Sequence, residues 1–228
     1  MSINQMVATN IQSIATNGLV AYFDAGLSAS YTANSSTWTD TVGSDNNATL
    51  VNSPTYSSNN NGYYTFNGTN QYATVNGSPI NVTNYTKCVW VYFNASADNN
   101  ILSYDDNNAT GHYMYTGGTS SLYNGHTSWS GFPTTYSSAT TFNNSTWYNI
   151  VVTFNTTDGM TLYVNGTLDS TYTAQKTAPV GAGLNFGCYA VAGNLLNGRI
   201  AQVLIYNRTL SAAEVRQNFA ATRGRFRI

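Results

Sequence analysis

The chain has 228 residues, only 7% of them charged, and its formal net charge is −1. So few charges exclude a disordered acidic or basic tail, and they argue against nucleic acid as the main partner, because binding to phosphate depends on many lysines and arginines. Apolar residues make up 42% of the sequence, which is enough for a sizeable core. Glu214 is the only glutamate, which disfavours a largely helical fold. The composition therefore favours one β-rich domain.

Residues 1–17 form a separate N-terminal segment. Ile3, Val7, Ile11 and Ile14 follow one another at helical spacing, which predicts an arm that orders against a neighbouring subunit; a frayed terminus is the alternative. The segment has no basic stretch followed by an apolar run, so we expect no secretory signal. No apolar run in the chain approaches 18 residues, so we also expect no insertion into a membrane.

From residue 18 onward the sequence reads as short strands separated by turns rich in Asn, Gly and Ser. Two hairpins are predicted, one joining residues 63–66 to 71–75 and one joining 161–164 to 167–170, because Asn-Gly turns accept positive φ angles. The longest strands are expected at residues 87–93, 147–154 and 200–206. More than ten such strands at close spacing predict a β-sandwich.

One short helix is predicted before the C-terminus. Ser211 and Glu214 have the spacing of a capping box, and Leu210 and Val215 stand where a hydrophobic staple would pack. Gly224 is expected to end the helix with a positive φ angle.

The two cysteines allow two interpretations. Cys88 and Cys188 are both flanked by strand-like residues, so they could form one disulfide closing a long loop, or remain small buried thiols. We favour the thiols, because two cysteines are no disulfide framework.

Several motifs occur in the order found in one large family. Residues 19–26, 38–50, 66–75, 162–166 and 197–211 resemble, in sequence and spacing, the laminin-G-like, concanavalin A-like jelly-roll family. The resemblance implies an all-β, two-sheet antiparallel jelly-roll sandwich over residues 18–222, with one short C-terminal helix. With its opening residues 19–26 and its closing residues 224–228, the chain also looks like domains of structural proteins from tailed phages.

The resemblance raises the question of calcium, which some related domains hold at the rim of the sandwich. Asp24, Asp40 and Asp45 are the candidate ligands, but Asn67 and Gln71 stand where the family pattern has acidic residues. Calcium takes six to eight oxygen ligands, commonly including carboxylates. The alternative is that Asp24 and Asp40 are turn residues that bond to nearby backbone. We therefore expect no required cofactor, and both possibilities stay open: a calcium ion bound by these residues, or aspartates that only stabilise turns.

The sequence offers little for catalysis. Glycoside hydrolysis needs a pair of carboxylates, and the Glu-x-Asp-x-x-Glu strand that the resemblance implies for related glucanases is absent. Glu214 is engaged in the helix cap. A metal site from Asp105, His112 and His126 matches no ligand spacing. We therefore predict that the chain is not an enzyme.

A glycan-binding surface is the stronger hypothesis. The segment between residues 104 and 136 concentrates aromatic residues among Gly, Ser, Thr and Asn, and such rings offer flat amphipathic faces while neighbouring amides can meet sugar hydroxyls. The alternative is that the rings simply pack across strands. The candidate glycan-binding residues are Tyr104, Tyr113, Tyr115, Tyr123, Trp129 and Tyr136.

Charge is unevenly distributed along the chain. Residues 199–228 carry +5 and residues 1–198 carry −6. The closing Arg223, Arg225, Phe226, Arg227 and Ile228 alternate in character as an edge strand would. We predict that this tail docks on an acidic neighbouring chain with Phe226 and Ile228 buried; the alternative is that it pairs within its own chain.

These features combine into one functional prediction and one alternative. We predict a non-enzymatic virion protein, such as a capsid decoration, fibre or tail component, that displays a jelly roll at the virion surface. It would oligomerise, contact other virion proteins and bind a host-surface glycan. The alternative is a secreted or cell-surface carbohydrate-binding module in an extracellular setting.

Overall fold

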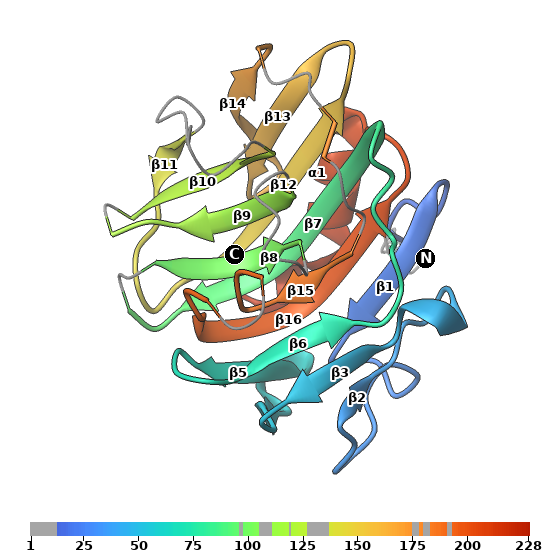
Figure 1. Cartoon of the computed structure of the whole chain (residues 1–228), viewed down its shortest axis with the longest axis vertical. Coiled ribbons are helices and arrows are strands. Elements are labelled where there is room, and N and C mark those ends of the chain that lie inside the picture. Colours follow the sequence, from blue (N-terminus) through green and yellow to red (C-terminus); the bar gives the residue numbers. More distant parts are fainter. Residues whose placement is uncertain are drawn as a thin grey trace, which may run out of the picture.

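The chain folds into two antiparallel β-sheets packed face to face (Figure 1). The computed structural model describes residues 13–95, 98–104, 111–118, 120–126, 137–174, 178–179, 183–190 and 193–228. Within these residues each sheet has eight strands. The predicted jelly-roll sandwich with a short C-terminal helix is thereby confirmed.

The front sheet consists of β2 (Thr37–Trp38), β3 (Ala48–Val51), β6 (Tyr72–Val75), β8 (Asn99–Ser103), β9 (His112–Thr116), β10 (Ser121–His126), β11 (Ser137–Thr141) and β15 (Asn185–Phe186). The back sheet consists of β1 (Leu19–Asp24), β4 (Thr55–Ser57), β5 (Tyr63–Asn67), β7 (Asn84–Phe93), β12 (Trp147–Asn155), β13 (Gly159–Val164), β14 (Thr167–Tyr172) and β16 (Asn197–Tyr206). Hydrogen bonds order the front sheet β11-β10-β9-β8-β15-β6-β3-β2 and the back sheet β14-β13-β12-β7-β16-β5-β4, with β1 also paired to β16. Short 3-10 turns occupy Ser44–Asn46, Asn59–Asn61 and Arg223–Arg225, and the helix α1 spans Ala212–Thr222.

The three long strands predicted from the sequence form the centre of the back sheet. β7 pairs with β12 on one side and with β16 on the other. Almost every residue of these strands is buried, because the core covers one face of the sheet and α1, together with residues 14–15 and Phe226, covers the other. Strands covered on both faces read as continuous apolar runs, which is why the sequence identified them.

One predicted hairpin is confirmed and the other is wrong. β13 and β14 pair around Asn165 and Gly166, whose φ angles are 50° and 74°. In contrast, β5 belongs to the back sheet and β6 to the front sheet, so they do not pair. The Asn67 side chain accepts hydrogen bonds from the backbone of residues 69, 70 and 71, which turns the chain across the sandwich. The apolar side chains of β5 and β6 therefore meet across the core.

Aromatic rings from both sheets fill the space between them. Phe23 of β1 lies 5.8 Å from Trp38 and 5.1 Å from Phe186, both in edge-to-face geometry. All three side chains are 0% exposed. Such contacts stabilise the two layers against each other beyond the area they bury.

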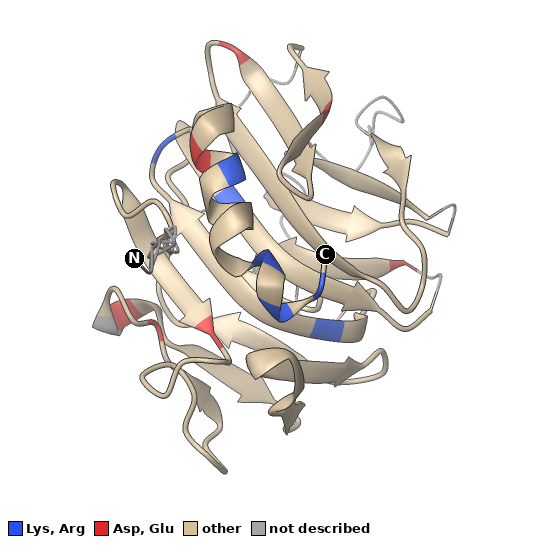
Figure 2. Ribbon diagram, turned by 180° about the vertical axis from the view of Figure 1, so that it is seen from behind, with Lys and Arg blue, Asp and Glu red and all other residues tan. Residues whose placement is uncertain are grey.

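The helix α1 lies against the outer face of the back sheet (Figure 2). The capping box is confirmed, since the Ser211 side chain accepts from the Glu214 backbone and Glu214 binds back to Ser211. Leu210 and Val215 are both buried against the sheet, as expected of the staple positions. No helix in the described residues has the length and apolar character of a membrane span.

The C-terminal end differs from the prediction. Gly224 does not take a positive φ angle and does not end the helix; the chain passes at Thr222 into the right-handed 3-10 turn. The tail forms a 3-10 turn and not the predicted edge strand. This turn stacks the ring of Phe226 on that of Trp90, with the ring centroids 4.1 Å apart. An extended tail would lose this buried contact.

Cys88 and Cys188 are both free and buried. Cys88 lies on the back sheet beneath α1, whereas Cys188 follows β15 of the front sheet. The interpretation as two buried thiols is therefore confirmed.

Lys87 of β7 is unusual because it is fully buried. Its Nζ atom lies 3.5 Å from the carbonyl oxygen of Tyr113 and 5.2 Å from the centre of the Tyr85 ring, and no salt bridge reaches it in the described part of the chain. Burial lowers the pKa of Lys87 from its ordinary 10.5 to about 7. The folded chain thus disfavours the charged form of this side chain.

Lys87→Met should stabilise the protein. The unfolded chain binds more protons than the folded chain between about pH 7 and pH 10.5, so wild-type stability should rise with pH across this window and carry the full penalty below it. A pKa shift of this size corresponds to up to roughly 5 kcal/mol. Urea unfolding at pH 6, 7.5 and 9 should show the variant more stable at pH 6 and a smaller difference at pH 9. Val89→Met on the same face is the control, and equal pH profiles for wild type and Lys87→Met would contradict the interpretation.

Candidate functional site

Three of the predicted tyrosines form a row on the outer face of the front sheet. Tyr115 of β9 lies directly opposite Tyr123 of β10, and their rings stack 5.2 Å apart at 21°. Tyr113 follows on the same face of β9, with its ring 5.8 Å from that of Tyr115. Because side chains alternate along a strand, the neighbouring Met114 and Leu122 point into the core instead. We call Tyr113, Tyr115 and Tyr123 the tyrosine row.

Two glycines give the rings of the row their room. A Cβ atom at Gly125 would lie 2.6 Å from the Tyr113 hydroxyl oxygen, and one at Gly117 would lie 2.7 Å from the Tyr123 ring. Both distances are shorter than Cβ contacts allow, so each ring lies over bare backbone. The tyrosines could be predicted from the sequence, whereas these two glycines were not; their spacing to the aromatic residues was the available signal.

The row differs in exposure from one end to the other. Tyr113 is only 4% exposed, whereas Tyr115 and Tyr123 are half-buried and reach the surface. Burial raises the pKa of Tyr115, with further contributions from Tyr123 and from the exposed Asp98. Its hydroxyl therefore remains protonated at neutral pH and can donate a hydrogen bond to a ligand.

Of the other three predicted glycan-binding residues, Tyr104 lies beside the row and the other two lie outside the described residues. Tyr104 is half-buried directly after β8, and its backbone N–H donates to the carbonyl of His112. Trp129 and Tyr136 lie outside the described residues. The structure thus brings Tyr113, Tyr115 and Tyr123 together and places Tyr104 next to the start of β9.

Two buried histidines lie on the opposite, inner face of β9 and β10. The Nε2 atom of His126 is 2.6 Å from the Tyr85 hydroxyl, and that of His112 is 2.8 Å from the carbonyl oxygen of residue 183. Burial and the nearby Lys87 hold the pKa of His112 well below its usual value. Asp105 lies outside the described residues, and in those that are described no three metal-ligating side chains cluster. The two histidines therefore belong to the core.

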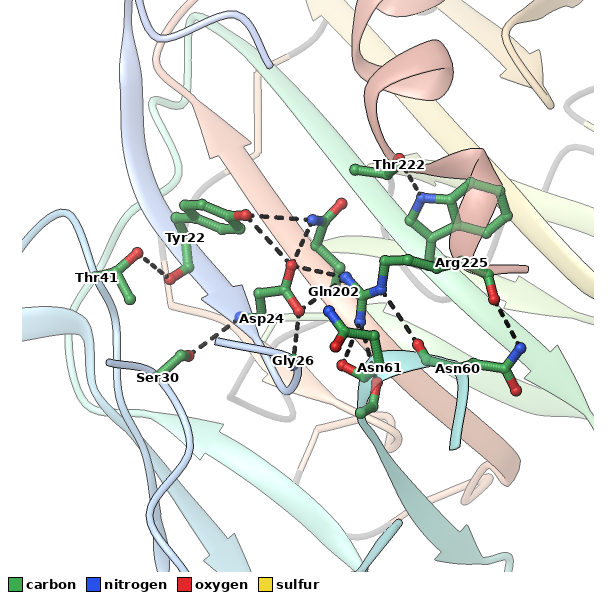
Figure 3. Close-up of polar contacts among 12 residues, drawn as sticks. Tyr22, Asp24, Gly26, Ser30, Thr41, Asn60, Asn61, Gln202, Thr222 and Arg225 are labelled. Atoms are coloured by element: carbon green, nitrogen blue, oxygen red, sulfur yellow. Dashed lines mark hydrogen bonds and ion pairs between the residues drawn. The ribbon is translucent and has the colours of Figure 1, made fainter. Parts of the chain in front are cut away.

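Asp24 is the centre of a polar network at the end of β1 (Figure 3). It is 3% exposed, and its carboxylate accepts from the Tyr22 hydroxyl, the Gly26 backbone and the Gln202 amide. Nη1 of Arg225 contacts both carboxylate oxygens, at 2.9 and 2.8 Å. The charge of Asp24 is thus already neutralised by a guanidinium.

The proposed calcium ligands do not fit the ion. A cation bound to Asp24 would face the Arg225 guanidinium, which occupies both carboxylate oxygens. Asp40 accepts from the backbone of Tyr22 and Val42 and from the Asn46 amide, while Asp45 is exposed in the first 3-10 turn. The alternative stands: Asp24 and Asp40 each bond to the backbone two residues ahead, as turn residues do.

Some of the predicted assembly residues lie outside the described residues, some pack against their own chain, and some are exposed. Ile3, Val7 and Ile11 lie outside the described residues, and Ile14 packs against its own chain beside α1. Phe226 is 6% exposed and Arg225 pairs with Asp24, which is the intramolecular alternative for the tail.

The other end residues remain available for contacts. Arg223, Arg227 and Ile228 are exposed, and their role in assembly stays a prediction.

The carboxylates of Glu214 and Asp169 stabilise the fold through hydrogen bonds within the chain. Arg208 binds Glu214 through two hydrogen bonds of 3.0 and 2.6 Å, which together with the helix cap lower the pKa of Glu214 to about 2. Asp169 accepts from the backbone of residues 139 and 140 and joins β11 to β14. Neither carboxylate is placed or protonated as a general acid would need.

The sequence belongs to a family that this geometry fits. Residues 67–216 match the family model of the concanavalin A-like lectin/glucanases superfamily, and the chain belongs to that superfamily. No curated protein matches the sequence significantly.

Solved structures share the fold at low sequence identity. Trypanosoma rangeli sialidase superposes with a TM-score of 0.69 at 16% identity, over 93% of this chain and 34% of the sialidase. The receptor-binding domain of botulinum neurotoxin type G gives 0.63 at 15% identity, over 89% of this chain and 51% of that one. Domain 4 of AbnA, an extracellular arabinanase of Geobacillus stearothermophilus solved with arabinotriose, gives 0.65 at 14% identity, over 89% of this chain and 98% of that domain. This chain spans about a third of the sialidase, and the likeness establishes the fold alone.

Arg225→Met should destabilise the fold strongly. It leaves the Asp24 carboxylate buried without a counterion, for which losses of about 3–5 kcal/mol are typical. The double variant Asp24→Asn, Arg225→Met should recover part of this loss, because no uncompensated charge remains. Urea unfolding compares the wild type with both variants, and Arg223→Met, at an exposed arginine two residues earlier in the same 3-10 turn, is the control. A loss for Arg225→Met no larger than that of the control would show that the ion pair contributes little.

Proposed function

We propose that the chain is a non-enzymatic carbohydrate-binding module whose ligand lies on the tyrosine row. The observation that carries the proposal is the stacked pair Tyr115 and Tyr123, which is partly exposed on a sheet face. Tyrosine rings contribute flat apolar area at low entropic cost and keep a hydroxyl for hydrogen bonding, which suits the two kinds of surface that a sugar ring presents.

Two further observations support a sugar ligand. The superfamily takes its name from lectins and glucanases, and domain 4 of AbnA, similar over almost its whole length, was solved with a bound oligosaccharide. Among the described residues, Asp98 is the only acidic or basic side chain that contributes to the pKa shift of Tyr115, and no lysine or arginine contributes to it. A neutral glycan is therefore the ligand class that we propose.

The finer proposal is display on a virion, as a capsid decoration, fibre or tail component. The resemblance of residues 19–26 and 224–228 to domains of tailed-phage structural proteins supports it. The two faces of the sandwich also differ in charge: arginines gather on α1 and the C-terminal tail behind the back sheet, opposite the tyrosine row (Figure 2). One face would bind the particle and neighbouring copies, and the other would face the host.

A secreted or cell-surface module that acts without a virion is the second candidate. It is favoured by the match to AbnA domain 4, which covers 98% of a domain from an extracellular enzyme. Purified virus particles distinguish the two candidates. The chain should co-purify with particles at fixed copy number, and Arg216→Ser with Arg223→Ser should lower that number; recovery only from particle-free medium would favour the secreted module.

Loss of the tyrosine row should weaken glycan binding. Tyr115→Ala with Tyr123→Ala removes the stacked pair, and two lost aromatic contacts of about 0.5–1.5 kcal/mol each predict a drop in affinity of roughly 5- to 150-fold. A glycan array identifies the ligand, and titration calorimetry compares the variants. Tyr72→Ala is the matched control, since Tyr72 is half-buried on β6 and lies away from the row. Unchanged binding in the double variant would contradict the proposal, and turnover of a bound polysaccharide would contradict the non-enzymatic assignment.

A further inference from the structure

A hollow of about 500 Å³ lies at the opposite edge of the sandwich, where β2 and β3 of the front sheet approach β4 of the back sheet. Figure 1 shows these strands at the far end from β9 and β10. Its volume falls within the range of about 300–1,000 Å³ that small-molecule sites occupy. Two loops, residues 31–36 and 53–56, form most of its rim.

Three tyrosines line the hollow. Tyr31 and Tyr56 stack with ring centroids 3.6 Å apart at 11°, and Tyr64 turns its edge toward both, at 6.3 and 5.8 Å. Tyr31 and Tyr56 are half-buried, whereas Tyr64 is only 2% exposed. The aromatic part of the wall is thus fixed from beneath by a buried ring.

The hydroxyl of Tyr64 is buried with no hydrogen-bond partner in the described part of the chain. Nε1 of Trp38, whose ring lies 4.9 Å from that of Tyr64, is in the same condition. Unpartnered buried polar groups are rare in folded proteins, because each costs the free energy of its lost hydration. Burial also raises the pKa of Tyr64, so its hydroxyl keeps its proton and can donate. Because this hydroxyl has almost no exposed surface, a ligand oxygen would reach it only where the half-buried ring of Tyr31 or Tyr56 shifts, and would then give it the partner that the described chain does not supply.

The rim of the hollow is held in a strained shape. Asn34, Asn52 and Ser53 have φ angles of 61°, 56° and 54°, in the left-handed region that such residues adopt at a cost. The Gln71 amide donates to the carbonyls of both Asn52 and Ser53, at 3.1 and 3.0 Å, and fixes the loop. Rigid rims bind with less loss of conformational entropy, so this loop is preorganised for a ligand.

We propose that this hollow is a second binding site, separate from the tyrosine row, for a neutral sugar residue. Aromatic rings and a rim of serine, threonine and asparagine side chains line it, an unpartnered donor is buried behind the rings, and the lining carries no charge. This combination matches an uncharged ring compound with several hydroxyl groups. An anionic sugar would find no cation among the lining residues.

Tyr64→Phe tests the proposal sharply, because it removes one hydroxyl oxygen and keeps the ring. Replacing an unpartnered buried hydroxyl should leave the melting temperature equal or higher, whereas sugar binding should weaken about tenfold, as for a lost hydrogen bond in a dry site. The probes are the methyl glycosides of glucose, galactose, mannose and N-acetylglucosamine, with N-acetylneuraminic acid as the anionic probe. Saturation-transfer NMR on the full chain detects contact, and titration gives the affinity.

Variants at both sites separate this proposal from that for the tyrosine row. Tyr123→Ala should leave the signal of the hollow unchanged, and Tyr56→Ala should remove it while binding at the row persists. Tyr72→Phe is the matched hydroxyl control. No contact with any neutral probe, equal affinity in wild type and Tyr64→Phe, or preference for the anionic probe would each overturn the proposal. A loss confined to Tyr123→Ala would do the same and leave the tyrosine row as the site.

Discussion

The ion pair between Asp24 and Arg225 is the constraint on which the rest of the structure depends. It joins residues 201 positions apart, at the end of the first strand and in the last 3-10 turn. The same guanidinium donates to the carbonyls of residues 60, 61 and 62, and so fixes the loop before β5 (Figure 3). Because the two charges lie away from water, each depends on the other. The tail is thereby held where Phe226 can stack on Trp90.

The C-terminal tail, packed behind the back sheet, covers the aromatic residues on that outer face of the sandwich. Trp90, Trp147 and Phe226 form one buried cluster behind the back sheet, and Tyr206, Leu204 and Val215 form another beneath α1. The aromatic surface of that sheet is therefore used for folding. The outer face of the front sheet keeps Tyr115 and Tyr123 partly exposed, which is why we propose that the ligand binds there. The basic residues follow the helix and tail to the other face, so charge and aromatic surface are separated by the fold.

The features predicted correctly from the sequence are those that depend on residues close together in the chain. The long buried strands, the Asn165-Gly166 hairpin and the Ser211 cap each depend on residues close in sequence, and each is confirmed. The predicted hairpin between residues 63–66 and 71–75 was wrong, because an Asn-Gly turn also suits a chain that crosses between sheets, and the distant partner strands decide which of the two forms. The same limit applies to the tail, whose partner Asp24 no local pattern reveals. Of the candidate site, composition predicted the tyrosines, but which of them share a face follows from the register of β9 and β10.

The scarcity of charge takes on a more specific meaning in the folded chain. Two of the six arginines are used in ion pairs, with Asp24 and Glu214, and the described carboxylates with the most partners serve caps and turns. Uncharged Asn, Ser and Thr side chains therefore provide most of the polar surface that hydrogen-bonds to water, and they surround the exposed aromatic rings. A surface built in this way has little electrostatic attraction for distant ligands, so recognition depends on short-range stacking and hydrogen bonds. Single contacts of that kind are weak, and the two proposed sites, one on the outer face of the front sheet and one between β3 and β4, would gain affinity if one glycan engaged both.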